Sequence, residues 1–229
     1  MKYFEFGQEH PELMVMLHGG GTSYRGMLPT AQEMARVYHV VLVAYDGFNP
    51  DEPETEFRSP MDEAKRLGDH LVEHYGGKID ILYGISYGCR ILMEVLADPR
   101  LTVTTTIADG MGLKDYPNIR SKWGKDVYRF LYGKATWRSW KNQGYFFLGR
   151  KTDFTLFEKT DAHLWYGIRG SVDQKLSQNL SALREKGYPF TEKIFPDLGH
   201  GGLAGEQPER FSREVQAAHR ASLGKEGVK

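Results

Sequence analysis

The chain has 229 residues, and its 30 basic and 30 acidic side chains give a formal net charge of zero at neutral pH. This length suits one ordinary domain with a sizeable core. The neutral charge argues against nucleic acid or an anionic membrane surface as a partner, and no apolar run approaches the ~20 residues that a membrane span requires.

The first residues and the cysteine content indicate the compartment. The amino-terminal stretch carries an acidic residue early, at Glu5, and lacks the long apolar segment of a signal peptide. Cys89 is the single cysteine, so an internal disulfide is excluded and a reducing compartment fits. We therefore expect a cytoplasmic protein.

Short apolar runs typical of buried strands alternate with amphipathic helical patterns along the chain. We expect strands at residues 1–7, 13–17, 40–45, 79–82, 102–108, 163–169 and 190–195, and helices at residues 26–38, 59–75, 89–98, 171–186 and 208–223. The start of the 59–75 helix is well marked, because Ser59 can cap it and Pro60 takes its first position. The alternation predicts an α/β fold, with a mostly parallel central sheet flanked by helices and ligands at the carboxyl ends of the strands.

A glycine-rich loop, residues 18–21, follows the strand at residues 13–17. It could cradle a phosphate, but the Gly-Lys-Ser/Thr sequence is absent and the Gly-x-Gly-x-x-Gly spacing fails. The alternative is an oxyanion hole, in which backbone N–H groups stabilise a developing negative charge. His18 itself is interpreted as a hydrogen-bonded loop residue rather than a base.

The strand that begins at residue 79 ends in Gly84-Ile85-Ser86-Tyr87-Gly88, and an apolar helical pattern starts at once. A strand that turns this sharply into a helix strains the turn residue and needs small neighbours where strand and helix pass. Gly84 and Gly88 meet that demand, and the Ser86 hydroxyl is exposed at the tip. The alternative is a glycine-rich turn with an incidental serine, in which Cys89 is a small buried residue.

Between residues 111 and 160 the alternation breaks, and aromatic side chains are interleaved with lysine and arginine. Such a mixture could stack on single-stranded nucleic acid, but the neutral charge of the chain argues against that, and aromatic clusters usually signify buried packing. We predict an α/β core of residues 1–110 and 161–229, with a helical cap inserted at residues 111–160 whose aromatic residues wall a pocket.

Reactive side chains follow the predicted strands at residues 18–21, Asp46, Ser86, Asp109, residues 169–173 and His200. Because parallel strands end at one edge of a sheet, these side chains are expected to gather there. His200 could instead cap its loop, and Asp46 could simply open a turn. The gathering nevertheless favours a nucleophilic site over an incidental serine.

These motifs resemble the α/β-hydrolase family over nearly the whole chain. The matching features are the 18–21 loop, expected after the third strand, the 84–88 turn, expected after the fifth, and His200 between glycines after the last. The resemblance implies that Ser86 is the nucleophile and His200 its general base, with an oxyanion hole made by the N–H groups of Tyr87 and of Gly20 or Gly21.

The acid of the triad departs from the usual family pattern. The family commonly places it three residues after the glycine that ends the strand before the last helix–strand pair, and here that position is Gly170. Asp173 lies 200 − 173 = 27 residues before His200, although a helix start would also favour a carboxylate there. Asp109 is the other candidate, although it could equally open an Asp-Gly turn. Both remain candidates, with a slight preference for Asp173.

The expected function is hydrolysis of a small or medium carboxylic ester through an acyl-enzyme, with a small molecule as the substrate and no metal or organic cofactor. The same triad would serve a C–C bond hydrolase, an amidase or a thioesterase. A catalytically silent binding protein of this fold is the alternative from another class, favoured by the missing acid at Gly170. The sequence leaves the choice between monomer and homodimer open.

Overall fold

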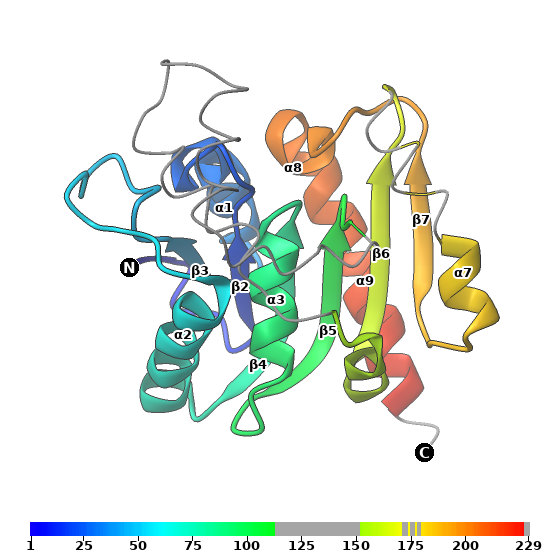
Figure 1. Ribbon diagram of the computed structural model, residues 1–229, viewed down its shortest axis with the longest axis horizontal. Helices are drawn as coiled ribbons and strands as arrows, with labels where there is room; N and C mark the ends of the chain where they lie inside the picture. The colour runs from blue at the N-terminus through cyan, green and yellow to red at the C-terminus, as the bar shows by residue number, and fades with distance from the viewer. Residues whose placement is uncertain (113–151, 171–173, 175–176, 178–179, 227–229) are drawn as a thin grey trace, which may run out of the picture.

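The seven strands of the protein form one sheet, in a computed structural model that describes residues 1–112, 152–170, 174, 177 and 180–226 (Figure 1). The strands are β1 (Lys2–Phe6), β2 (Leu13–Leu17), β3 (His39–Ala44), β4 (Lys78–Ile85), β5 (Thr102–Asp109), β6 (Asp161–Gly167) and β7 (Thr191–Phe195). Their order is β1-β3-β2-β4-β5-β6-β7, and every neighbouring pair is parallel except β1 with β3. The mostly parallel sheet expected from the sequence is therefore confirmed.

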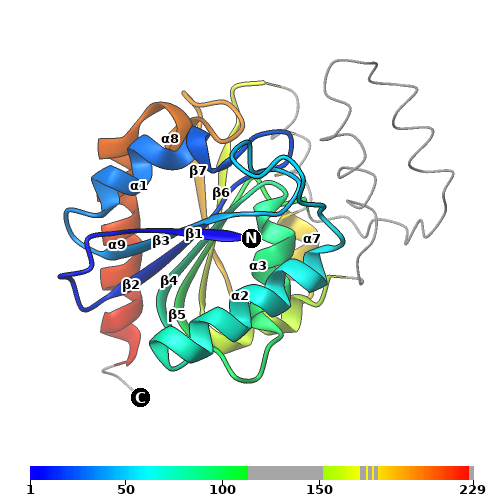
Figure 2. The same ribbon diagram turned by 90° about the vertical axis from the view of Figure 1, so that its left-hand side faces the viewer.

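Helices cover both faces of this sheet. They are η1 (Tyr24–Met27), α1 (Leu28–Met34), α2 (Pro60–Tyr75), α3 (Gly88–Leu96), η4 (Phe154–Lys159), α7 (Leu180–Glu185), α8 (Gly202–Glu206) and α9 (Pro208–Glu226). Figure 2 shows α1, α8 and α9 on one face and α2, α3 and α7 on the other. Side chains of the two strand faces join two separate buried clusters, one under each helical layer.

The central strand β2 shows why the sheet forms. All five of its residues are buried, and they alternate between the clusters: Met14 and Met16 face the α1–α9 side, while Val15 and Leu17 face the α2–α3 side. A continuous apolar strand is stable only with helices on both faces. The same alternation holds in β3 and, from Ile81 onward, in β4, so buried side chains support both faces of the strands that lead to the 18–21 loop and Ser86.

Two expectations about the elements are corrected. The helix expected at residues 26–38 is a short η1 turn followed by α1, which begins at Leu28 because Pro29 suits a first turn and ends at Met34. The 18–21 loop and the 84–88 turn follow the second and fourth strands of this chain, β2 and β4, rather than the third and fifth. The order of the motifs along the chain is unaffected.

The cap insertion predicted at residues 111–160 lies largely outside the described residues. Of the part that is described, Met111 is buried and η4 packs against the core through Phe154, Leu156 and Phe157. The segment that leads into β6 therefore packs on the α2–α3 side of the sheet.

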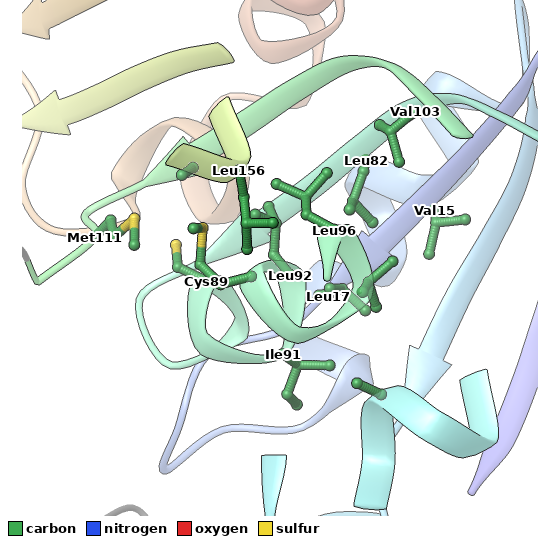
Figure 3. Close-up of a cluster of buried hydrophobic side chains, with 14 of the residues drawn as sticks. Val15, Leu17, Leu82, Cys89, Ile91, Leu92, Leu96, Val103, Met111 and Leu156 are labelled. Carbon is green, nitrogen blue, oxygen red and sulfur yellow. The ribbon is translucent and has the colours of Figure 1, made fainter. Parts of the chain in front are cut away.

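Helix α3 packs its apolar face on the sheet directly after the 84–88 turn. Figure 3 shows Ile91, Leu92 and Leu96 of α3 beside side chains of β2, β4 and β5. Cys89, on the first turn of α3, is 1% exposed and its thiol donates to the carbonyl of Gly84 at 3.1 Å. Burial of this helix anchors the residue that precedes it, Tyr87, and with it the turn.

Helix α2 carries a buried carboxyl group, Glu63, into the core. Its Oε2 accepts a hydrogen bond from the N–H of Asp46 at 3.4 Å, and among the described residues its Oε1 has no hydrogen-bond partner. Burial, reinforced by the negative charge of Asp46 and opposed by Arg66, raises the pKa of Glu63 to about 8. Near neutral pH this carboxyl group therefore holds a proton in the folded protein.

The free energy of unfolding is expected to fall between about pH 5 and pH 8 in the wild type, and Glu63→Gln is expected to remove most of this fall. Because the folded pKa lies above the unfolded value, the wild type binds more protons when folded, and its free energy of unfolding falls as pH rises through this window. The effect is on the order of a few kcal/mol. Urea denaturation at a series of pH values measures it, with the exposed Glu73→Gln on the same helix as control; parallel profiles for wild type and Glu63→Gln would contradict it.

Candidate active site

The turn between β4 and α3 places Ser86 in a strained backbone conformation. Its φ is 52°, the one positive φ among the described residues other than glycine. Such a conformation costs a side-chain-bearing residue about 1 kcal/mol or more and persists only where the surroundings enforce it. Here the Ser86 N–H donates to the carbonyl of Asp109 at 2.7 Å, and the half-buried serine side chain is held at the carboxyl edge of the sheet.

Close backbone contacts explain the glycines on both sides of Ser86. A methyl group on Gly88 would lie 2.4 Å from the carbonyl oxygen of Leu17, and one on Gly84 would lie 3.0 Å from the backbone of Gly88. Gly88 therefore requires glycine, because its obstacle is backbone that cannot rotate away, and Gly84 has little room for a larger residue. The turn is consequently pressed against the end of β2.

The 18–21 loop lies against the same turn. A methyl group on Gly19 would be in van der Waals contact with the Cβ of Ser86, at 3.5 Å, so the loop passes close to the serine. His18 is completely buried, its Nδ1–H donates to the carbonyl of Gly19 at 2.9 Å, and burial lowers its pKa to about 4. Its imidazole is therefore neutral at ordinary pH and holds the Gly19 peptide in one orientation.

The predicted oxyanion donors differ in exposure. Gly20 is half-buried and Gly21 is exposed with a φ of 73°, while Tyr87 is 2% exposed. The Tyr87 ring packs 5.6 Å from that of Phe57, in a buried aromatic group that also contains Tyr45 and Phe48. This packing turns the Tyr87 side chain away from solvent and leaves its backbone at the site beside Ser86.

His200 lies over the end of β5. A methyl group on Gly110 would be 2.5 Å from Cε1 and 2.7 Å from Nδ1 of His200, so the Nδ1 edge of the imidazole faces the residue that follows Asp109. The next residue, Gly201, lies equally close to the side chain of Ile85. His200 is exposed, whereas Asp109 is 3% exposed.

Ser86, the 18–21 loop, Asp109 and His200 are thus brought to one edge of the sheet. Asp173 lies outside the described residues. Asp46 is placed elsewhere, in contact with Arg66 of α2, and Cys89 is buried beneath the turn. Asp109 is thus a buried acidic residue, and its neighbour in the chain, Gly110, lies against the imidazole of His200.

Two residues of this arrangement were missed from the sequence. The hydroxyl of Tyr83 donates to Oδ2 of Asp109 at 2.8 Å, and Gly110 forms the surface under His200. The available signal for Tyr83 was a tyrosine within an otherwise aliphatic buried strand, because a buried hydroxyl needs a partner. Gly110 was noted only as part of an Asp-Gly turn.

The described residues contain no group of three or more His, Cys, Asp or Glu side chains that could hold a metal ion. In the same part of the chain, no helix combines the length and the apolar character needed to cross a bilayer.

Gly110→Ala is expected to lower turnover roughly a hundredfold, because the new methyl group would displace the His200 ring and a misplacement of about 1 Å can cost that much. Gly76→Ala is the matched control. Gly76 has nearly the same φ, 61° against 62°, but a methyl group there meets nothing within 4 Å. Both variants should lose a similar amount of stability, which thermal denaturation measures, whereas only Gly110→Ala should lose activity in steady-state kinetics. Equal activities of the two variants would contradict the proximity of His200 to Gly110.

A mostly parallel sheet, a strained serine between strand and helix, and a histidine after the last strand together define the α/β-hydrolase fold class. The sequence profile of the alpha/beta hydrolase family matches residues 14–215. The chain belongs to the alpha/beta hydrolase family.

Several solved structures share this fold. A thermophilic esterase from Thermogutta terrifontis is 15% identical with a TM-score of 0.73, covering 96% of this chain and 93% of its own. MenH from S. aureus is 14% identical with a TM-score of 0.72, and the match covers 97% of this chain and 98% of MenH. A meta-cleavage product hydrolase from Pseudomonas fluorescens IP01 is 16% identical with a TM-score of 0.68, and the match covers 96% of this chain and 94% of the hydrolase. At such identities the likeness shows the fold alone, and no curated protein sequence matches the chain.

Proposed function

We propose that the protein is a serine hydrolase that cleaves small or medium carboxylic esters, with Ser86 as nucleophile, His200 as general base and Asp109 as the orienting acid. The observation that carries the proposal is the strained Ser86, held by its N–H on the carbonyl of Asp109 while His200 lies over Gly110. Strain stored at one serine, with an imidazole at the same edge of the sheet, supports nucleophilic catalysis.

The chemistry follows from these groups. His200 takes the proton of Ser86 as Oγ bonds to the ester carbonyl carbon, and the N–H groups of Tyr87 and Gly20 or Gly21 stabilise the oxyanion. His200 returns the proton to the leaving alcohol as the C–O bond breaks. Water then attacks the acyl carbon and gives a proton to His200. As the bond between the acyl carbon and Oγ breaks, His200 passes this proton to Oγ, which releases the acid and restores the Ser86 hydroxyl.

Two considerations support an ester over an amide. An alcohol leaves a tetrahedral intermediate more readily than an amine, so esters make the smaller demand on proton donation to the leaving group. The Thermogutta terrifontis protein of the same fold is an esterase. Small or medium size is proposed because Ser86 is half-buried rather than fully exposed.

The test is hydrolysis of p-nitrophenyl esters from acetate to octanoate, with and without a fluorophosphonate. In the fluorophosphonate reaction, Ser86 Oγ bonds to phosphorus and fluoride leaves, so mass spectrometry of the labelled peptide identifies the nucleophile. We expect ester turnover that is lost in proportion to labelling of Ser86. A folded protein that neither hydrolyses these esters nor becomes labelled would overturn the proposal and favour a binding protein.

A further inference from the structure

A buried hydrogen bond joins the strand that ends at the nucleophile to the strand that ends at Asp109. Tyr83 lies on β4, three residues before Ser86, and its hydroxyl donates to Oδ2 of Asp109 at 2.8 Å. The register of the parallel pair explains the contact. Tyr83 is opposite Ile107 and Ile85 is opposite Asp109, so the side chains at 83 and 109 project from the same face of the sheet.

We propose that Tyr83 is a positioning residue of the catalytic triad, which holds one oxygen of the Asp109 carboxylate so that the other is presented to His200. The proposal rests on the proposed function, because it gives Asp109 the role of the triad acid. A carboxylate accepts hydrogen bonds at both oxygens. Oδ2 is bound to Tyr83, and we assign Oδ1 as the acceptor of the Nδ1–H of His200.

The backbone of the same residues is fixed independently. The carbonyl of Asp109 accepts the N–H of Ser86 at 2.7 Å, and the Cys89 thiol lies 3.5 Å from that carbonyl. The main chain of the acid is thereby tied to the main chain of the nucleophile. Tyr83 adds the remaining constraint, which is the rotation of the Asp109 side chain.

Tyr83 is suited to act as a permanent donor. It is completely buried, and burial together with the charge of Asp109 and the hydrogen bond to it raises the pKa of Tyr83 well above its usual value. The phenol therefore stays protonated wherever a hydrolase of this class works. Its ring packs edge-to-face on Phe211 of α9, with centroids 4.8 Å apart at 88°, which fixes the direction of the hydroxyl.

Tyr83→Phe keeps this ring packing and removes only the hydroxyl. We expect kcat to fall roughly tenfold to a hundredfold, the effect of losing a hydrogen bond to a charged group, with KM unchanged because Tyr83 lies beneath the sheet edge. Without the donor, the Asp109–His200 pair binds its proton more tightly, so the acidic limb of the pH profile of kcat/KM should move to higher pH by roughly 0.5–1 unit. A merely structural role would not move this limb.

The matched control is Tyr3→Phe. Tyr3 lies on the edge strand β1, and its hydroxyl donates to the backbone carbonyl of Arg66 at 3.2 Å. This change also removes one tyrosine hydrogen bond, but to a neutral acceptor far along the sheet from β5. Its kcat and pH profile should match the wild type. In an Asp109→Asn background, Tyr83→Phe should have little further effect, because the two residues act as one unit.

The experiment measures p-nitrophenyl ester kinetics and the rate of fluorophosphonate labelling of Ser86 against pH, for wild type, Tyr83→Phe and Tyr3→Phe, with denaturation midpoints for each. A lower kcat with a displaced acidic limb in Tyr83→Phe alone supports the proposal. An unlabelled, inactive wild type would overturn the hydrolase function itself. If the wild type is active and Tyr83→Phe has the same kcat and the same acidic limb, the role of Tyr83 is overturned and the hydrolase function stands. A lower kcat in Tyr83→Phe without a displaced acidic limb would have the same consequence.

Discussion

Ser86→Ala is expected to lower ester turnover by roughly 10⁴-fold to 10⁶-fold, the range that the loss of a triad nucleophile produces. No other described hydroxyl shares its position, at a φ of 52° and close to Gly19. KM should change little, because the proposed oxyanion donors remain. Steady-state kinetics on the best p-nitrophenyl ester measures the loss.

The structure of the variant should persist, since alanine keeps the Cβ that the turn already accommodates and the Ser86 N–H bond to Asp109 does not involve the hydroxyl. Ser212→Ala is the matched control: Ser212 is a 5% exposed serine on α9 that accepts a hydrogen bond from the side-chain amide of Gln216. It should lose some stability and keep its activity. Substantial turnover in a purified, folded Ser86→Ala protein would contradict the assignment of the nucleophile.

Much of the fold was predictable because its signals are local. The apolar run at residues 13–17 forms β2 with the expected bounds, and Ser59 caps α2 by accepting the N–H of Asp62 at 3.0 Å. The turn after β4 was also predictable, because Gly88 is required, and Gly84 is favoured, by close contacts between strand and helix. Each of these features depends on residues close together in the chain.

The less predictable features depend on which parts of the chain meet. Helix α8 has five residues, two of them glycine, so its pattern is too short to signal a helix. The contact between Tyr83 and Asp109 follows from the register of β4 against β5, which sets which side chains share a face. A choice between Asp109 and Asp173 could not be made for the same reason, because chain spacing does not show which carboxylate lies near His200.

That choice is open to a direct kinetic comparison of Asp109→Asn and Asp173→Asn. We expect Asp109→Asn to lower kcat roughly 10⁴-fold, because an amide in place of the carboxylate neither stabilises the imidazolium of His200 nor holds its productive tautomer. Asp173→Asn should stay within a few-fold of wild type. The expectation rests on the burial of Asp109 and on the closeness of the His200 Nδ1 edge to Gly110.

The Asp109→Asn variant should remain folded, because the asparagine carbonyl can still accept the hydroxyl of Tyr83. Its fluorophosphonate labelling should slow in parallel with kcat, since both reactions need Ser86 to be deprotonated by a correctly oriented His200. A large loss in Asp173→Asn with a near-normal Asp109→Asn would transfer the role of the acid to Asp173, and near-normal turnover in both would remove both carboxylates from the triad. In either of those cases Asp109 would not be the acid of the triad, and Tyr83 would have no catalytic carboxylate to position. The same two variants therefore also test the positioning role proposed for Tyr83.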